Sequence, residues 1–140
     1  MQTREYKTIF AGPSKIGKTT FLHKLFYNNN DIYNLRTIPS TLGVTVMPVD
    51  FYNENDKIRL DIWDCAGDRR YKGLGKQYYI NSNLAIVFKD KTSFHRNIIN
   101  DINEICGNIP ILEINNFDKY KNYEVYKNLI TNFLIEQNLL

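Results

Sequence analysis

The sequence predicts an α/β domain with a mostly parallel sheet and one antiparallel hairpin strand at the sheet edge. Three observations lead to this fold class. Strand-like runs alternate with helical patterns, two nearly continuous apolar runs suit parallel strands buried on both faces, and two alternating runs are joined by a polar turn. A length of 140 residues is typical of one domain, so residues 1–140 are expected to form a single unit.

A strand, a loop and a helix are expected at the start of the chain. Residues 6–11 form a short strand-like run that ends directly in a Gly/Pro/Ser turn. The next segment has apolar residues at helical spacing, which are Phe21, Leu22, Leu25 and Phe26. Residues 28–39 are polar and have no apolar period, so they predict a mobile connection.

A hairpin is expected after this connection. Residues 44–52 and 58–63 alternate between apolar and polar side chains, as half-buried strands do, and residues 53–56 supply the turn. Pro48 cannot donate a hydrogen bond to a ladder. The first strand of the hairpin is therefore expected at the edge of the sheet.

The rest of the chain predicts two strands and two helices. Residues 84–88 and 109–114 are the apolar runs that suit buried parallel strands. The helix that crosses between them is indicated by a repeat of three and four residues at Ile98, Ile99, Ile102 and Ile105. The last helix has the same spacing at Val125, Leu129, Ile130, Phe133 and Leu134. This order of elements favours right-handed crossovers.

Charge limits the partners that the chain is expected to have. The formal net charge is +3 without a basic tail, so direct binding to nucleic acid is not expected. One basic cluster is present, and a run of this kind is usually a solvated helix start. It consists of Arg69, Arg70, Lys72 and Lys76.

Targeting signals are not found in the sequence. No apolar run reaches the roughly 18 residues that a membrane-spanning helix needs, and the start is polar where a secretory signal is apolar. Gln2 excludes myristoylation, and the C-terminus has no cysteine for prenylation, so no lipid anchor is expected. Cys65 and Cys106 are expected to be free thiols. The protein is expected in the cytoplasm or nucleus, neither secreted nor membrane-anchored.

The most specific motif is a phosphate-binding loop. Residues 12–19 follow the pattern Gly-x-x-x-x-Gly-Lys-Thr, in which backbone amides wrap a phosphate and the following helix adds its dipole. Lys18 is expected to reach the β- and γ-phosphates of a nucleoside triphosphate, and Thr19 to ligate Mg²⁺. The loop lies between a predicted strand and a predicted helix, as the motif requires. Its expected binding residues are Gly12, Pro13, Ser14, Lys15, Ile16, Gly17, Lys18, Thr19 and Thr20.

Two further segments with functional residues follow predicted strands. Asp64 ends an apolar strand and can hold Mg²⁺ through water, while the N–H of Gly67 can reach a γ-phosphate. Asn115, Asn116 and Asp118 follow the last predicted strand, where a carboxylate can accept two N–H bonds from guanine. Each motif alone is weak, because the second segment in particular can be an ordinary turn.

With these motifs in place, the chain resembles the Ras superfamily of small GTPases, and within it the Ran group. The resemblance runs from about residue 6 to about residue 118. Residues 41–48, with Thr-Leu-Gly-Val followed by Val-x-Pro, are Ran-like and carry the assignment to this group. The other matching segments are residues 12–21, 63–67, 78–80 and 108–111.

The resemblance implies a three-layer P-loop NTPase fold, here a single small-GTPase-like G domain, that binds GTP or GDP with Mg²⁺. The chain stops before the family's last strand and helix, so an apolar sheet surface is expected to be exposed. The implied Mg²⁺ ligands are Thr19, Thr41 and Asp64.

Roles in hydrolysis and in nucleotide recognition are implied by the same resemblance. The residues implied in hydrolysis are Thr41, Gly67 and Asp68. The nucleotide contacts implied outside the phosphate loop are Asp64, Ala66, Gly67, Asn115, Asn116 and Asp118.

The implied partners are effectors or importin-β-like transport carriers that bind a monomeric switch. Order and disorder of residues 28–43 and 65–79 would depend on the γ-phosphate, and the partners would bind the ordered form. The implied carrier surface combines residues 41–48 with the basic cluster. A role in nucleocytoplasmic or intracellular transport follows from this resemblance.

Four residues depart from the family's pattern. Asp68 stands where the family has the Gln that positions the attacking water, so slow hydrolysis is expected. Asn116 stands where a Lys usually braces the phosphate loop, so weaker nucleotide affinity is expected. Ser14 and Lys15 stand where glycines are common, and Lys15 can either add favourable charge or collide with a partner.

Three functions agree with the sequence. The first is a working GTPase with slow intrinsic hydrolysis. The second is a catalytically inactive pseudo-GTPase that serves as an interaction module or decoy, which Asp68 and Asn116 suggest. The third is a P-loop kinase or ATPase, but such an enzyme requires a lid with more arginines than Arg69 and Arg70 provide.

We expect the Asp68→Gln variant to hydrolyse GTP clearly faster than the native protein. A neutral amide orients water better than an anionic carboxylate beside the γ-phosphate. The measurement is single-turnover GTP hydrolysis, and an unchanged or slower rate would contradict the water-positioning argument.

Overall fold

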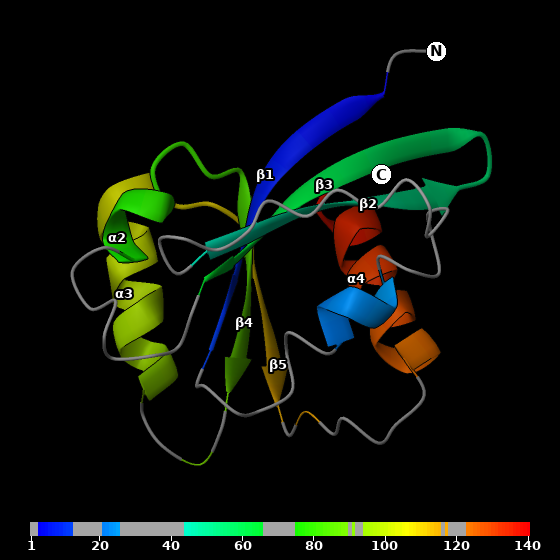
Figure 1. Ribbon diagram of the computed structural model, residues 1–140. Helices are drawn as coiled ribbons and strands as arrows, with labels where there is room; N and C mark the ends of the chain where they lie inside the picture. The colour runs from blue at the N-terminus through cyan, green and yellow to red at the C-terminus, as the bar shows by residue number, and fades with distance from the viewer. Residues whose placement is uncertain are drawn as a thin grey trace.

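A five-stranded sheet organises the part of the chain that the structure describes. The computed structural model describes residues 3–12, 21–25, 44–65, 75–89, 91, 94–115, 117 and 123–140. The strands are β1 (Arg4–Ala11), β2 (Val44–Asn53), β3 (Asp56–Cys65), β4 (Leu84–Lys89) and β5 (Ile111–Asn115). The helices are α2 (Gly75–Tyr78), α3 (Phe94–Cys106) and α4 (Tyr123–Glu136), and residues 21–25 are also helical (Figure 1).

The strands lie in the order β2-β3-β1-β4-β5. β1 pairs in parallel with β3 and with β4, and β4 pairs in parallel with β5. β2 and β3 form an antiparallel hairpin whose turn contains Glu54, with φ 54°. β2 is an edge strand, as Pro48 predicts. The mostly parallel sheet with a hairpin at its edge is therefore confirmed.

Helices cover both faces of the sheet and make three layers (Figure 1). Because side chains alternate along a strand, Phe10 and Ile9 of β1 point to opposite faces. The Phe10 face packs against α4 and residues 21–25, and the Ile9 face packs against α2 and α3. The residues of β4 from Leu84 to Phe88 are fully buried, as predicted for a parallel strand covered on both faces.

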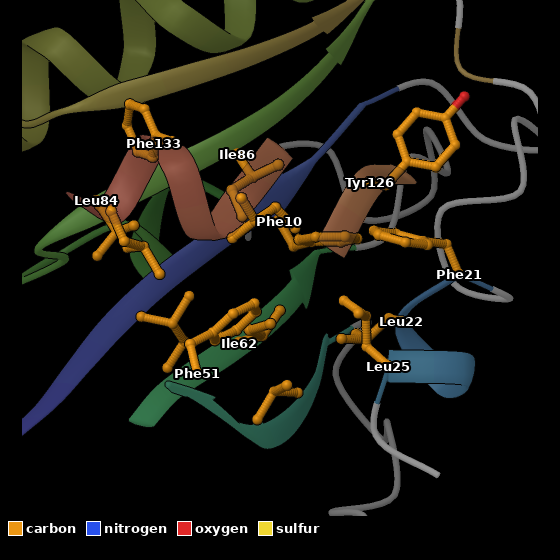
Figure 2. Packing of buried hydrophobic residues seen from close by; sticks show 14 of the residues in the cluster. Phe10, Phe21, Leu22, Leu25, Phe51, Ile62, Leu84, Ile86, Tyr126 and Phe133 are labelled. Atoms are coloured by element: carbon orange, nitrogen blue, oxygen red, sulfur yellow. The ribbon is translucent and has the colours of Figure 1, made fainter. Parts of the chain in front are cut away.

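Helix α4 closes the Phe10 face of the sheet. It buries four side chains, which are Tyr126, Ile130, Phe133 and Leu134. All four belong to the same buried cluster as Phe10 and Ile86 of the sheet, and Figure 2 shows Tyr126 and Phe133 in this cluster. Full burial of an apolar side chain contributes about 1.5–3 kcal/mol to folding. The expectation of an exposed apolar sheet surface is wrong for this face, because the last helix of the chain covers it.

Strand β5 is less buried than the sequence predicts. Ile114 is buried, but Glu113 and Asn115 are exposed, and the first two residues of the strand are half-buried. The prediction that residues 109–114 are buried on both faces, as in β4, is wrong. The reason is that β5 is the last strand of the described sheet and has a neighbouring strand on one side only.

Both long helices end in a left-handed residue. Gly107 has φ 74° and follows α3, and its N–H donates to the carbonyl of Asn103 at 3.0 Å. Asn138 has φ 59° and follows α4, after which the N–H of Leu139 donates to the carbonyl of Leu134 at 2.9 Å. None of the helices in the described ranges is long and apolar enough to cross a membrane.

Candidate functional site

Three of the predicted site residues lie in the described part of the chain, and these are Gly12, Asp64 and Asn115. The others lie outside the described residues, namely Pro13, Ser14, Lys15, Ile16, Gly17, Lys18, Thr19, Thr20, Thr41, Ala66, Gly67, Asp68, Asn116 and Asp118. The predicted mobile connection at residues 28–39 and the basic residues 69, 70 and 72 also lie outside them.

Gly12, Asp64 and Asn115 all lie at the carboxyl ends of their strands, which together form the carboxyl edge of the sheet. Gly12 follows β1, Asp64 is next to last in β3, and Asn115 ends β5. These strands belong to the parallel part of the sheet, so their carboxyl ends point the same way. In the strand register, Phe10 lies beside Asp64, and Lys89 of β4 lies beside Asn115. Ligands of open α/β sheets bind outside this edge.

Gly12 lies so close to β4 that it has no room for a side chain. A Cβ atom on Gly12 would lie 2.9 Å from the Cβ of Phe88 and 3.1 Å from its carbonyl oxygen. Carbon atoms in optimal contact are about 3.5–4.0 Å apart. The first glycine of the phosphate-loop pattern is therefore required by its packing on the end of β4.

Asp64 supplies a buried carboxylate at this edge, with 7% of the residue exposed. It shares a sheet face with Ile62, because alternate residues of a strand point the same way. Residues 21–25 pack on that face and begin two positions after Thr19. Carboxylate oxygens are preferred ligands of Mg²⁺, so the placement of Asp64 fits its predicted role.

The predicted Mg²⁺ site is only partly described. Among the described residues, no group of three His, Cys, Asp or Glu side chains lies together as a metal site. Two of the three predicted ligands, Thr19 and Thr41, lie outside them, so Asp64 is the one whose position can be compared with the prediction.

The start of β2 reaches the same edge. Thr45 pairs with Asp64, and Val44 pairs with Cys65. Thr41 stands three residues before Val44 in the sequence and lies outside the described residues.

Residues 115–118 form the predicted base-reading segment, and of these the structure describes Asn115 and Phe117. Asn115 is exposed at the end of β5, and Lys89 beside it forms an ion pair with Glu113 at 3.5 Å. Phe117 instead packs against the buried core. The sequence motifs do not single out Phe117, although an aromatic residue inside a polar loop is a signal that could have found it.

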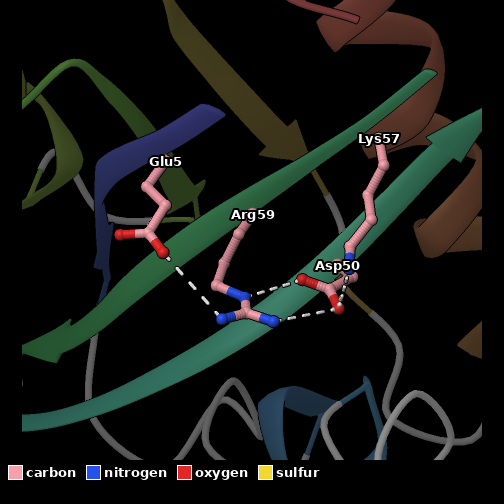
Figure 3. Close-up of polar contacts among 4 residues, drawn as sticks. All are labelled: Glu5, Asp50, Lys57 and Arg59. Atoms are coloured by element: carbon pink, nitrogen blue, oxygen red, sulfur yellow. Dashed lines mark hydrogen bonds and ion pairs between the residues drawn. The ribbon is translucent and has the colours of Figure 1, made fainter. Parts of the chain in front are cut away.

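A network of charges lies on the part of the Ile9 face that the hairpin forms (Figure 3). The Nε of Arg59 donates to Asp50 Oδ1 at 2.8 Å, and its Nη1 lies 3.9 Å from Glu5 Oε1. Lys57 Nζ lies 3.5 Å from Asp50 Oδ2. Burial acts to raise the pKa of Asp50, but the hydrogen bond from Arg59 and the charges of Arg59 and Lys57 outweigh it and lower the pKa. The network ties β1, β2 and β3 together.

An aromatic patch lies on the same face, nearer the carboxyl edge of β3. The Nζ of Lys7 lies 4.0 Å from the centroid of the Trp63 ring and donates to the carbonyl of Ile80 at 2.7 Å. The Trp63 ring also lies 6.1 Å from the ring of Tyr78 in α2. Val46 of β2 pairs with Trp63, so the described part of the predicted carrier surface borders this patch.

A comparison with protein families adds one match to this geometry. The family described as "Roc: Ras of Complex, Roc, domain of DAPkinase" matches residues 7–118. The match extends from β1 through the hairpin and β4 to the end of the predicted base-reading segment. It therefore includes every predicted site residue of the chain.

We expect Gly12→Ala to weaken both folding and nucleotide binding, because the new Cβ atom must push the chain away from Phe88. Overpacking of this kind costs about 1–3 kcal/mol in the free energy of unfolding. Chemical denaturation and titration with fluorescent mant-GDP measure the two effects.

The matched control for this prediction is Gly107→Ala. Its position has open space for a Cβ, but a φ of 74° makes alanine unfavourable there by about 1–2 kcal/mol. This variant should lose stability without losing affinity for mant-GDP. Equal affinities of the Gly12→Ala and Gly107→Ala proteins would contradict the role of the Gly12 contact.

Proposed function

The chain belongs to the Roc family of Ras-like GTPase domains, and we propose that it is a switch whose GTP or GDP lies at the sheet edge formed by Gly12, Asp64 and Asn115. One observation supports this most. The three motif residues belong to the ends of three different strands, and these ends lie together at the carboxyl edge of the sheet. The Gly-x-x-x-x-Gly-Lys-Thr pattern begins there, at a glycine that packing requires. GTP binding with Mg²⁺ is general in Ras-like GTPases, and the individual contacts below are proposed.

The nucleotide phosphates are proposed to lie against the backbone amides of residues 12–19, with Lys18 at the β- and γ-phosphates. Thr19, Thr41 and Asp64 would hold Mg²⁺, whose positive charge would balance the negative charge of the phosphates. The buried position of Asp64 at the end of β3 supports this assignment. Guanine is proposed to be recognised by Asn115, the last residue of β5, and by Asp118.

Hydrolysis transfers the γ-phosphoryl group of GTP to water and gives GDP and inorganic phosphate. Thr41 and the N–H of Gly67 are proposed to hold the γ-phosphate oxygens, and Asp68 is proposed to take the place from which the attacking water must be oriented. An anionic group at that place orients the water poorly and repels the phosphate. The proposed enzyme is thus a GTP hydrolase with low intrinsic activity.

The partner is proposed to be a transport carrier of the importin-β-like kind that binds the GTP form of a monomer. The matched family is Roc, so the Ran-like role rests on residues 41–48 of the sequence. Among the described strands β2 is the outermost one, and a strand at this position can pair with a partner, which supports the role. Such a role would place the protein in the cytoplasm, the nucleus or both.

We expect Asp118→Asn to abolish GTP binding and to create binding of xanthosine nucleotides. Exchange of the carboxylate for an amide reverses the donor and acceptor pattern that faces the base. Competition of GTP, XTP and ATP for bound mant-GDP measures this change. Lys18→Ala is the control, since it should remove binding whatever the base. Equal affinity of the native protein for ATP and GTP would refute guanine selectivity.

We also expect an importin-β-like carrier to bind the GTP-analogue form in preference to the GDP form, and Thr41→Ala to remove this preference. A carrier can shift the equilibrium only if its affinities for the two forms differ. Pull-down or calorimetry with each nucleotide measures the difference. Binding that is independent of nucleotide and of Thr41 would support the pseudo-GTPase function instead.

A further inference from the structure

Phe117 is the one residue of the base-reading segment with a described side chain in the core. Its ring centroid lies 4.8 Å from that of Tyr126, 5.1 Å from that of Phe88 and 5.5 Å from that of Phe21. The rings are inclined to one another at 46°, 79° and 60°, within the edge-to-face and tilted arrangements that aromatic rings prefer. Three different elements thus hold the ring of Phe117 in place.

The three rings that contact Phe117 are themselves buried. Phe88 is fully buried, and Phe21 and Tyr126 are 4% and 6% exposed. Phe21 and Tyr126 also contact each other, with ring centroids 5.5 Å apart, and Phe88 contacts Phe10 at 4.8 Å. Figure 2 shows Phe21, Tyr126 and Phe10 converging from residues 21–25, α4 and β1. The ring of Phe117 therefore packs on a buried aromatic surface.

The same aromatic cluster holds both ends of the phosphate loop. Gly12, at the start of the loop, lies against Phe88. Phe21 is the first described residue after the loop, and it is helical. A residue of the base segment, Phe117, contacts both of these phenylalanines. The base segment and the two ends of the phosphate loop thus share one packed cluster.

The position of Phe117 in the chain makes this contact relevant to the base. It is directly followed by Asp118, and Asn115 stands two residues before it. Consecutive Cα atoms are about 3.8 Å apart, so the packing of Phe117 can affect the residues that are proposed to bind the base. The lysine that would brace the two loops by a polar contact is replaced here by Asn116.

We propose that Phe117 is a positioning residue for guanine recognition, which it supports through its ring contacts with Phe21, Phe88 and Tyr126. This inference rests on the proposed function, since it takes Asn115 and Asp118 as the residues that bind the base. Phe117 does not touch the nucleotide. It sets the distance between the base-reading segment and the phosphate loop, so that one bound nucleotide can contact both of them at the same time.

The test compares Phe117→Leu with Phe51→Leu in the full chain. Leucine keeps an apolar side chain and removes the ring contacts. Phe51 is a fully buried phenylalanine of the same core on β2, and it makes none of the ring contacts described for Phe117. The readouts are the release rate of mant-GDP and the ratio of the affinities for GDP and IDP, which lacks the exocyclic amino group of guanine.

Phe117→Leu should release mant-GDP about tenfold faster, as expected for the loss of several aromatic contacts, and should lower its preference for GDP over IDP. Phe51→Leu should lower the melting temperature while leaving that preference at the native value. Phe21→Leu, on the other side of the contact, should also lower the preference, and it provides a second variant if Phe117→Leu does not fold.

The outcomes separate this inference from the proposed function. A native protein that binds no guanine nucleotide would overturn both. A native protein that binds GDP, with the same preference for GDP over IDP in the Phe117→Leu, Phe21→Leu and Phe51→Leu variants, would overturn only the positioning role of Phe117.

Discussion

The parallel pairing of β1 with both β3 and β4 is the constraint on which the rest of the structure depends. A parallel neighbour can be reached only by a crossover, so after β3 and after β4 the chain leaves the sheet at the carboxyl ends of the strands and returns at the opposite ends. After β1 it also leaves at the carboxyl end. Segments that are distant in the sequence therefore start side by side. The hairpin brings in a further segment, because β2 is antiparallel and its first residues pair with the end of β3.

The order of strands and helices could be predicted because periodicity and turn chemistry are local properties. Pro48 placed β2 at the sheet edge for an equally local reason, its missing N–H. The cover that α4 provides and the exposure of β5 could not be predicted. Both depend on which elements become neighbours in space, and the apolar spacing of Ile130 and Leu134 is compatible with a helix on either face of the sheet.

In the candidate site, too, the features that are local in the sequence could be predicted, and the contacts between distant residues could not. Gly12 belongs to a motif of fixed spacing, because backbone amides that wrap a phosphate require it. The spacing does not reveal that Phe88 fills the place of a Cβ atom, or that Phe117 packs on the cluster behind the loop. The ion pair of Asp50 with Arg59 is an intermediate case. These residues are direct partners in the hairpin register, so the pair can be inferred once the turn is known.

Trp63 has a consequence for how this protein can be observed. It is the only tryptophan in the chain, so all indole emission comes from one point on β3. That point directly precedes Asp64, and the ring lies near both the ammonium group of Lys7 and the phenol ring of Tyr78. A nearby charge and ring shift the colour and yield of indole fluorescence. The molecule thus carries an intrinsic optical reporter beside the carboxyl edge of its sheet, and no dye has to be attached to follow changes there.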